Sequence, residues 1–363
     1  MTAYVVLCAA TWAVATHGGT AARDLVVVGG VLLIANITSA ARRGVPLGVA
    51  LSVLVLLCWL ILDGPVRVGF DLAAVRVAAL VVIAFLTVQA VRKTDTRGRE
   101  TVILGLVLLG CLQAVLAIAE AVPAVSMLQL PRADATLGYA NGLGIMLVAT
   151  LCLTLRQVVG PRQASGWWWA VGLQVVAILA TGSRTSIGLG FLLLLAAALL
   201  MRRPGIRLLV AILGLAGTAV VWVRFAVEPP EQRLHIWAET LRRIAAAPWI
   251  GEGPGPEPFS ITAPAARVTT HAHNELLQWT LEYGLIGLAL ALATVLVLVL
   301  RYRAKPRGPV DRWTAVAAGV IVAGSMTDFT LRITALTLIA AASTTLALVP
   351  SNQDVAEKPR VPM

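Results

Sequence analysis

The sequence predicts an all-α integral membrane protein with about twelve transmembrane helices. Of its 363 residues, 58% are hydrophobic and only 13% are charged, whereas soluble domains are roughly half apolar and a quarter charged. The mean hydropathy is +0.86. This composition excludes a soluble enzyme, a disordered protein and a DNA-binding domain, because too few charged residues remain to cover a soluble surface.

Each predicted helix is an apolar run close to the length that crosses a bilayer, roughly 20 residues. In chain order the runs lie at 3–16, 25–41, 47–62, 70–91, 101–121, 137–156, 166–181, 185–201, 206–223, 273–300, 313–328 and 333–349. The first run lacks the basic segment and cleavage site of a signal peptide, so we expect it to be a span. Some runs are short, so one of them could be re-entrant: 3–16, 47–62, 166–181, 185–201 and 313–328.

Basic residues gather in alternate loops of this topology. They are Arg42 and Arg43; Arg92, Lys93, Arg97 and Arg99; Arg156 and Arg162; Arg202, Arg203 and Arg207; Arg301, Arg303, Lys305, Arg307 and Arg312; and Lys358 and Arg360. Cytoplasmic loops of membrane proteins are enriched in Lys and Arg, so these loops and both termini are predicted to be cytoplasmic. The net charge of +11 therefore indicates orientation in a lipid bilayer, with no nucleic acid as partner.

The longest outward-facing segment, residues 224–272, contains one predicted amphipathic helix at 232–247. Its apolar stripe consists of Leu234, Trp237, Leu241 and Ile244, which recur at helical spacing. Such a helix is expected to lie on the outer membrane surface. Proline at position 248 ends the helix, and the turn-forming run GEGPGPEPF follows shortly after it.

Arg184 stands in the sequence TGSRTS, at the outer end of two apolar runs. Gly182 permits a tight turn, and Ser183, Thr185 and Ser186 could cap the helix that begins there. An arginine beside a helix amino-terminus is well suited to bind phosphate. The alternative is an arginine that only extends to the membrane interface.

His273 lies in THAHNELLQ, at the outer start of the run 273–300. Gly284 and Gly287 follow it by offsets that a helix of 100° per residue turns into roughly 20° and −40°, so we expect all three on one packed helical face. An imidazole in this place suits general-base catalysis, and a helix-capping histidine is the alternative. His271 completes an HxH pair, but no HExxH or DxD motif accompanies it, so we predict no metal and no cofactor.

Polar residues from distant parts of the chain converge on the predicted outer side: Asn141, Arg184, Arg233, His273, Asp328 and Arg332. Alone, Arg233 would be interpreted as a solvated surface residue. Polar groups beside membrane spans are costly and are frequently functional. Their convergence therefore predicts one extracytoplasmic active site.

These residues also carry a resemblance to the O-antigen ligase family. The stretch HNELLQWTLEYGLIG fits the family motif H-[N/S/Q]-x9-G-x-x-G, with His273, Asn274, Gly284 and Gly287 in place. The chain resembles the family further at LGYAN, GSRTS, RLHIW, APWIGEGPG and TDFTLRI. The resemblance covers about residues 135–349.

The resemblance implies a GT-C-like fold and a glycosyltransferase that uses a glycan on a polyprenyl (undecaprenyl) diphosphate carrier. It implies transfer to a hydroxyl of a glycan, lipid or protein acceptor, on the outer face of the bacterial cytoplasmic membrane. By motif, His273 would be the catalytic base, and Arg184 and Arg233 would bind the diphosphate. The remaining candidates would bind substrate or support the site: Asn141, Asn274, Asp328 and Arg332. Direct attack by the acceptor predicts a metal-independent, inverting reaction.

We accordingly expect N-terminal transmembrane helices over residues 1–134, a catalytic region over 135–349 that includes the loop 224–272, and a cytoplasmic tail over 350–363. Ligase, repeat-unit polymerase and protein O-oligosaccharyltransferase activities stay open at this point. A polysaccharide or lipid transporter is the alternative from another class, but transporters favour charges near the bilayer midplane. Arg76 is the only clear basic residue well inside a predicted span. Grouped arginines argue against a non-catalytic scaffold.

Overall fold

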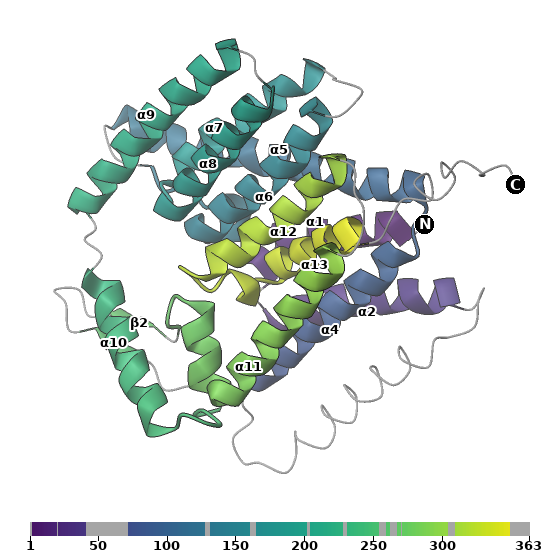
Figure 1. The fold of residues 1–363 in the computed structure, drawn as a ribbon, viewed down its shortest axis with the longest axis vertical. Helices are drawn as coiled ribbons and strands as arrows, with labels where there is room; N and C mark the ends of the chain where they lie inside the picture. The colour runs from purple at the N-terminus through teal and green to yellow at the C-terminus, as the bar shows by residue number, and fades with distance from the viewer. Residues whose placement is uncertain are drawn as a thin grey trace, which may run out of the picture.

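Helices make up almost all of the described chain. The computed structural model describes residues 2–19, 21–40, 72–127, 131–159, 165–201, 204–227, 231–253, 259–261, 267–269, 271–303 and 309–348. Within these ranges it contains twelve α-helices and one small sheet (Figure 1).

The helices follow the apolar runs of the sequence. They are α1 (Thr2–Ala15), α2 (Ala22–Ala40), α4 (Leu72–Arg92), α5 (Thr96–Ser126), α6 (Ala140–Val159), α7 (Trp168–Thr181), α8 (Arg184–Met201), α9 (Pro204–Val227), α10 (Glu231–Ala246), α11 (Glu275–Arg303), α12 (Pro309–Ser325) and α13 (Thr334–Leu348). All coincide with predicted apolar runs except α10, which is the predicted amphipathic helix. The run at 47–62, the tail at 350–363 and many of the loop arginines lie outside the described residues.

Local capping explains where two helices differ from the predicted boundaries. The helix α5 begins before its apolar run because the Asp95 side chain accepts a hydrogen bond from the Gly98 amide at 2.7 Å, which satisfies a free amide at the helix start. The helix α6 begins later than predicted because Gly138 adopts a left-handed conformation with φ of 67°.

Several helices are suited to a membrane by length and composition. Three described helices are long and apolar enough to cross one: Thr96–Ser126, Ala140–Val159 and Glu275–Val297. Shorter apolar helices lie at Thr2–Ala15, Val77–Arg92, Trp168–Thr181, Arg184–Leu199, Val210–Val223 and Thr334–Leu348. Large apolar side chains such as Leu215 and Trp222 on α9 are 76% exposed, which suits contact with lipid rather than water. The number of twelve crossings stays a prediction.

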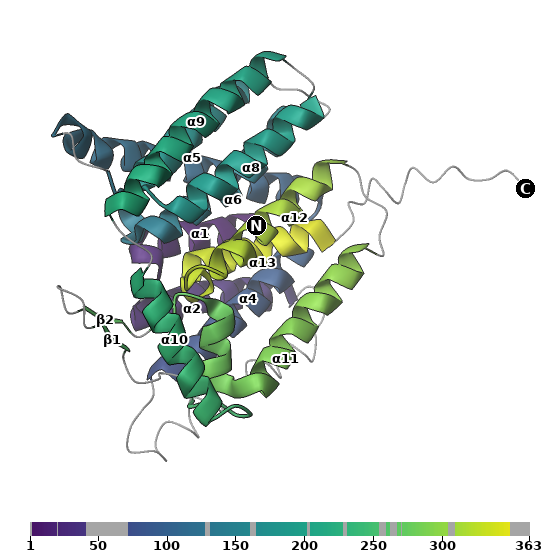
Figure 2. The same ribbon diagram turned by 60° about the vertical axis from the view of Figure 1, so that its left-hand side comes forward.

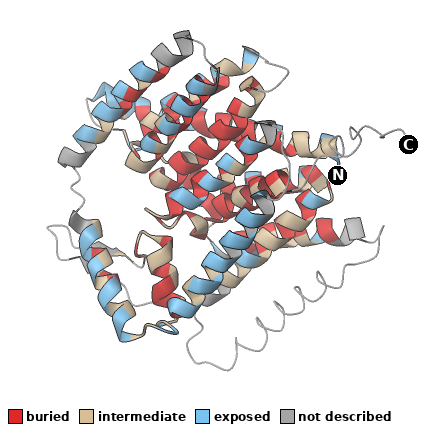
Figure 3. Cartoon of the chain, in the orientation of Figure 1, coloured by how far each residue is buried: buried red, intermediate tan, exposed pale blue. Residues whose placement is uncertain are grey.

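The centre of the fold lies around α6. Figures 1 and 2 show α6, α12 and α13 together in the middle, with α7, α8 and α9 to one side and α4 and α11 to the other. In the apolar segment of α6, 83% of the residues are buried, whereas in that of α11 only 24% are buried. Figure 3 shows the same contrast. The start of α6 is therefore fixed in the core, while much of α11 faces outward.

The amphipathic helix α10 divides its predicted apolar stripe between two surroundings. Trp237 and Ile244 pack against a small cluster of buried residues that includes Leu281 of α11. Leu234 and Leu241 instead stay 57% and 55% exposed. Part of the stripe therefore anchors α10 to α11, and the position of α10 on the outer membrane surface stays a prediction.

The described chain departs from a purely helical fold at one place. Strands β1 (Phe259–Ile261) and β2 (Arg267–Thr269) pair antiparallel, with Phe259 opposite Thr269. Phe259 belongs to the same buried cluster as α10, and the Arg243 guanidinium lies 5.1 Å from its ring centroid. This hairpin follows the turn-forming segment and covers one side of α10.

The helix α11 is broken at Gly284, and Figure 1 shows its two pieces meeting at an angle. Gly284 has φ of 64° and ψ of −170°, a conformation that is essentially restricted to glycine. The segment after α10 replaces the helical hydrogen bonds lost at the break: Leu285 N donates to Pro248 O, Ile286 N to Trp249 O, Glu252 N to Leu281 O and Gly253 N to Glu282 O. The predicted common face of His273, Gly284 and Gly287 is therefore wrong, since His273 precedes α11 and Gly284 interrupts it.

Gly284→Ala is expected to destabilise the protein strongly. A Cβ at this position would clash with the Trp249 carbonyl oxygen, and the backbone conformation alone costs an L-residue about 1–3 kcal/mol. Thermal unfolding in detergent should show a clearly lower Tm. Gly319→Ala is the matched control, since a Cβ there meets nothing within 4 Å; an equal loss in both variants would contradict the docking role of Gly284.

Candidate active site

A buried carboxylate, Asp328, lies at the centre of the polar cluster. It follows α12 and is 3% exposed. Its Oδ2 accepts hydrogen bonds from the Tyr139 hydroxyl and from Asn141 Nδ2, the latter at 2.7 Å. Its Oδ1 accepts from the Phe329 amide at 2.9 Å and lies 3.0 Å from His273 Nδ1. The end of α12, the start of α6 and the segment before α11 therefore meet at one carboxylate.

These contacts keep Asp328 ionised. Burial acts to raise the pKa of its carboxyl, but hydrogen bonds from His273, Tyr139 and Asn141, together with the charge of His273, outweigh burial and lower the pKa. Burial and the neighbouring Asp328 charge raise the pKa of the Tyr139 hydroxyl. Tyr139 therefore stays a hydrogen-bond donor to an anionic Asp328.

Asp328 also fixes the proton arrangement of His273. A carboxylate beside Nδ1 favours the tautomer with the proton on Nδ1, which leaves Nε2 as the basic nitrogen. The His273 side chain is 22% exposed and that of Asp328 is 4% exposed. The imidazole is therefore partly accessible, while the carboxylate beside it is buried.

An aromatic ring supports the same group. The Phe329 ring stacks on Tyr139 with centroids 4.8 Å apart. It also lies 4.6 Å from the His271 ring and 5.4 Å from the His273 ring. Sequence analysis did not single out Tyr139 or Phe329, although each adjoins a motif residue, in LGYAN and TDFTLRI.

Arg233 is attached to the turn that carries Asp328. Its Nη1 donates to the Thr327 carbonyl at 2.8 Å, and its Nη2 lies 3.8 Å from Asp328 Oδ2. The Arg233 side chain is 32% exposed, so the guanidinium is held in place yet remains accessible. Its interpretation as a purely solvated surface residue does not fit these contacts.

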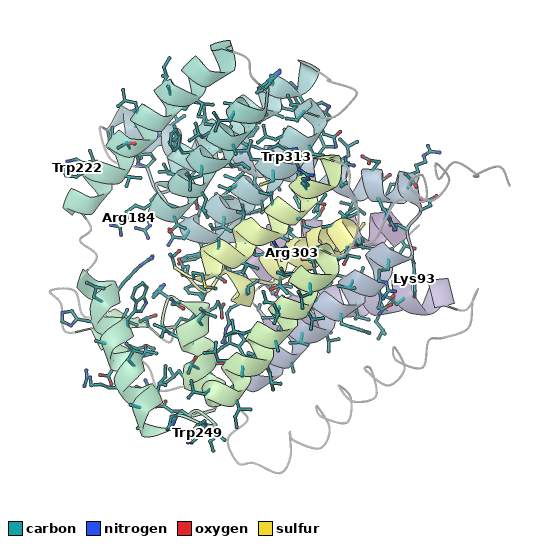
Figure 4. All side chains as sticks on the ribbon, in the orientation of Figure 1. Lys93, Arg184, Trp222, Trp249, Arg303 and Trp313 are labelled. Atoms are coloured by element: carbon teal, nitrogen blue, oxygen red, sulfur yellow. The ribbon has the colours of Figure 1, made fainter. Side chains whose placement is uncertain are left out.

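Arg184 begins α8 beside the same turn. The hydroxyl of the next residue, Thr185, lies 3.0 Å from the Thr327 hydroxyl, so Thr327 contacts both α8 and Arg233. Figure 4 shows Arg184 at the end of α8 that is directed toward α10. The structure therefore brings the start of α8, Arg233 and Asp328 to one end of the bundle.

The turn before α8 forms as the sequence predicts. Gly182 ends α7 in a left-handed conformation with φ of 60°. The Ser183 side chain caps α8, since its Oγ lies 3.4 Å from the Ser186 amide and accepts the Ser186 hydroxyl hydrogen at 2.9 Å. Arg184 is thus the first helical residue, beside the partial positive charge of the helix start.

Asn274 and Arg332 both contact residues of α11. The Asn274 side chain caps α11 by accepting from the Leu277 amide at 3.1 Å. Arg332 is 8% exposed, and its guanidinium pairs with Glu275 at 3.4 Å and Glu282 at 2.9 Å. Both residues hold the local structure, and their predicted contact with substrate stays a prediction.

The described residues contain no group of three or more His, Cys, Asp or Glu side chains that could hold a metal ion. The polar groups gathered around Asp328 are one imidazole, one guanidinium, a phenol and a carboxamide, from His273, Arg233, Tyr139 and Asn141. Guanidinium groups suit phosphate oxygens, and an imidazole backed by a carboxylate suits proton transfer.

Comparison with known proteins assigns this region to a family. Residues 169–292 match the family model described as O-antigen ligase. The matched segment includes Arg184, Arg233 and His273, while Asn141 and Asp328 lie on either side of it in the sequence. None of the curated proteins compared with the chain matches it. Enzymes of this family transfer lipid-linked glycans, and the chain is therefore a helical membrane glycosyltransferase with an O-antigen ligase domain at residues 169–292.

Proposed function

We propose that this enzyme transfers a glycan from a polyprenyl diphosphate carrier to an acceptor hydroxyl, with His273 as the general base. The observation that carries the proposal is the 3.0 Å contact between His273 Nδ1 and the buried Asp328 carboxylate. It leaves Nε2 available to accept a proton. Arg233 contacts the turn that carries Asp328, so the base and one phosphate-binding group belong to one site.

The proposed step is a direct displacement at the anomeric carbon. The acceptor oxygen forms a bond to this carbon while the bond to the diphosphate oxygen breaks. The hydroxyl proton passes to His273 Nε2, and the electron pair of the broken bond leaves with the diphosphate. One displacement inverts the anomeric configuration.

Arg184 and Arg233 would bind the diphosphate and stabilise the charge that develops on it. A guanidinium stays protonated and donates two parallel hydrogen bonds to phosphate oxygens. Donors fixed before the reaction stabilise developing charge more than mobile ones do. The contact of Arg233 with the Thr327 carbonyl supports such a fixed position.

The catalytic region would extend beyond the matched segment, over about residues 135–349. The contacts of Asp328 with Asn141 and with His273 support this extent. The extracytoplasmic position rests on the distribution of basic residues. Lys93 and Arg303, in predicted cytoplasmic loops, lie at the ends of their helices directed away from Arg184 (Figure 4), as that topology requires.

A transfer assay tests the proposal. Purified protein in nanodiscs is incubated with an undecaprenyl-diphosphate glycan and with candidate hydroxyl acceptors. We expect glycan on an acceptor in the inverted configuration, together with free undecaprenyl diphosphate. A retained configuration, or no cleavage of the donor with any acceptor, would overturn the mechanism.

The same assay separates the related activities. A polymerase lengthens the lipid-linked glycan when the donor is the only substrate, whereas a ligase needs a different acceptor. A transporter moves the intact donor across vesicles without cleaving it. The grouping of Arg184, Arg233 and His273 at one end of the helices favours the transferase.

A further inference from the structure

A buried chain of hydrogen bonds connects the segment before α11 with the turn that carries Asp328. Gln278 Oε1 accepts from the Ala272 amide at 2.7 Å, and Gln278 Nε2 donates to Glu282 Oε1 at 2.6 Å. Glu282 Oε2 accepts from Arg332 Nη2 at 2.9 Å. The chain therefore begins at the residue before His273 and ends four residues after Asp328.

The members of this chain are almost inaccessible. Gln278 and Glu282 are each 1% exposed and Arg332 is 8% exposed. Burying two charges and an amide is costly even when they are paired, and such pairs are weak evidence for stability. Burial keeps these groups away from substrate, so they would act only by holding other residues.

The segment before α11 carries an uncommon backbone conformation that has to be stabilised. His273 has φ of 51°, a left-handed conformation that is uncommon for residues other than glycine. Ala272 is fixed at both backbone groups, since its amide donates to Gln278 and its carbonyl accepts from Trp237 Nε1 at 2.9 Å. The 3.0 Å contact between His273 and Asp328 depends on this segment, because Asp328 belongs to a different part of the chain.

We infer that Gln278, Glu282 and Arg332 are positioning residues, which keep the imidazole of His273 aligned with Asp328 and with the acceptor. This inference rests on the proposed function of His273 as the base. Displacement of a reacting group by about 1 Å can reduce a rate about 100-fold. Loss of a partner that orients a metal-ligating side chain typically costs about 10- to 100-fold in activity, and we expect a loss of similar size for a partner that orients the base.

An exchange of the two side chains tests the inference. Gln278→Glu places two carboxylates against each other, and Glu282→Gln leaves one donor facing another donor. The double variant restores the order of donors and acceptors. The carboxylate at position 278 accepts from the Ala272 amide and from the new amide at position 282, whose oxygen accepts from Arg332. We expect each single variant to slow transfer about 10- to 100-fold and the double variant to recover to within a few-fold of the wild type.

The readout is single-turnover transfer from a labelled undecaprenyl-diphosphate glycan to the acceptor established in the transfer assay. Folded enzyme is quantified by size-exclusion chromatography and kept at the same concentration for every variant, so a lower rate constant reports misplacement of the base. Unchanged rate constants at equal amounts of folded enzyme would overturn the inference. If a charged variant fails to fold, Gln278→Met removes the hydrogen bonds without adding charge and should lower the rate constant alone.

Two further variants complete the test. Glu100→Gln removes the ion pair with Arg156, in which Arg156 Nη1 lies 2.8 Å from Glu100 Oε2, at the opposite end of α6. Its rate constant should equal that of the wild type.

His273→Ala in the same assay tests the proposed function. A normal rate in this variant removes the basis of both proposals. A lost rate in this variant together with normal rates in the Gln278 variants removes only the positioning role.

Discussion

His273→Ala is expected to abolish glycan transfer without reducing expression or folding. The substitution removes the nitrogen that would accept the acceptor's proton, and general-base catalysis typically contributes about 10²- to 10⁴-fold. Without the imidazole, Asp328 keeps its hydrogen bonds from Tyr139, Asn141 and the Phe329 amide, so we expect the fold to persist. The measurement is the initial rate of glycan transfer by purified protein, normalised to the amount of folded enzyme.

His235→Ala is the matched control for this variant, because His235 lies on the exposed surface of α10 and should be dispensable. Asp328→Asn should also slow transfer greatly, since it removes the anionic partner of the imidazole. Asp328→Asn added to His273→Ala should cost little more, because both substitutions act on the same group. Near-normal transfer by His273→Ala would remove His273 from the mechanism.

Arg184→Ala is expected to reduce transfer about 10²- to 10³-fold, the usual loss when one fixed donor to developing charge is removed. Arg184→Lys should recover only part of the rate, because an ammonium group keeps the charge but does not reproduce the planar two-donor geometry. Binding of undecaprenyl diphosphate should weaken in parallel. Both are measured on the purified variants.

Arg242→Ala controls for the loss of a positive charge on the same side of the protein. The Arg242 side chain is 76% exposed and pairs with Glu239 on the same helix, so we expect normal transfer. Arg184→Ala with unchanged rate and donor binding would show that this arginine only anchors the membrane interface. A rate loss of equal size in Arg242→Ala would indicate a general effect of charge.

Helix positions were largely predictable because their causes are local. The Gly182 turn and the Ser183 cap place the boundary between α7 and α8 within a few residues of the sequence. Apolar length similarly locates α6 and α13. The break in α11 was not predictable, because Gly284 is accommodated by carbonyl groups of the segment after α10.

The candidate site was predictable as a set of residues but not as an arrangement. Motif positions singled out Asn141, Arg233, His273 and Asp328, which the structure brings into contact through Asp328. The sequence did not indicate that Tyr139 binds the same carboxylate. It also did not indicate that Arg332 faces two glutamates of α11 instead of the open site.

Composition and local pattern alone determined that this chain is a helical membrane protein, where most of its helices begin, and which side chains are candidates for its chemistry. Those properties depend on residues that are close together in the sequence, so they can be deduced without knowledge of the packing. Only the tertiary structure decided that Asp328 is the partner of His273, 55 positions away. Hydrogen bonds between such distant groups depend on how α6, α11 and α12 pack, and packing is set by the whole chain.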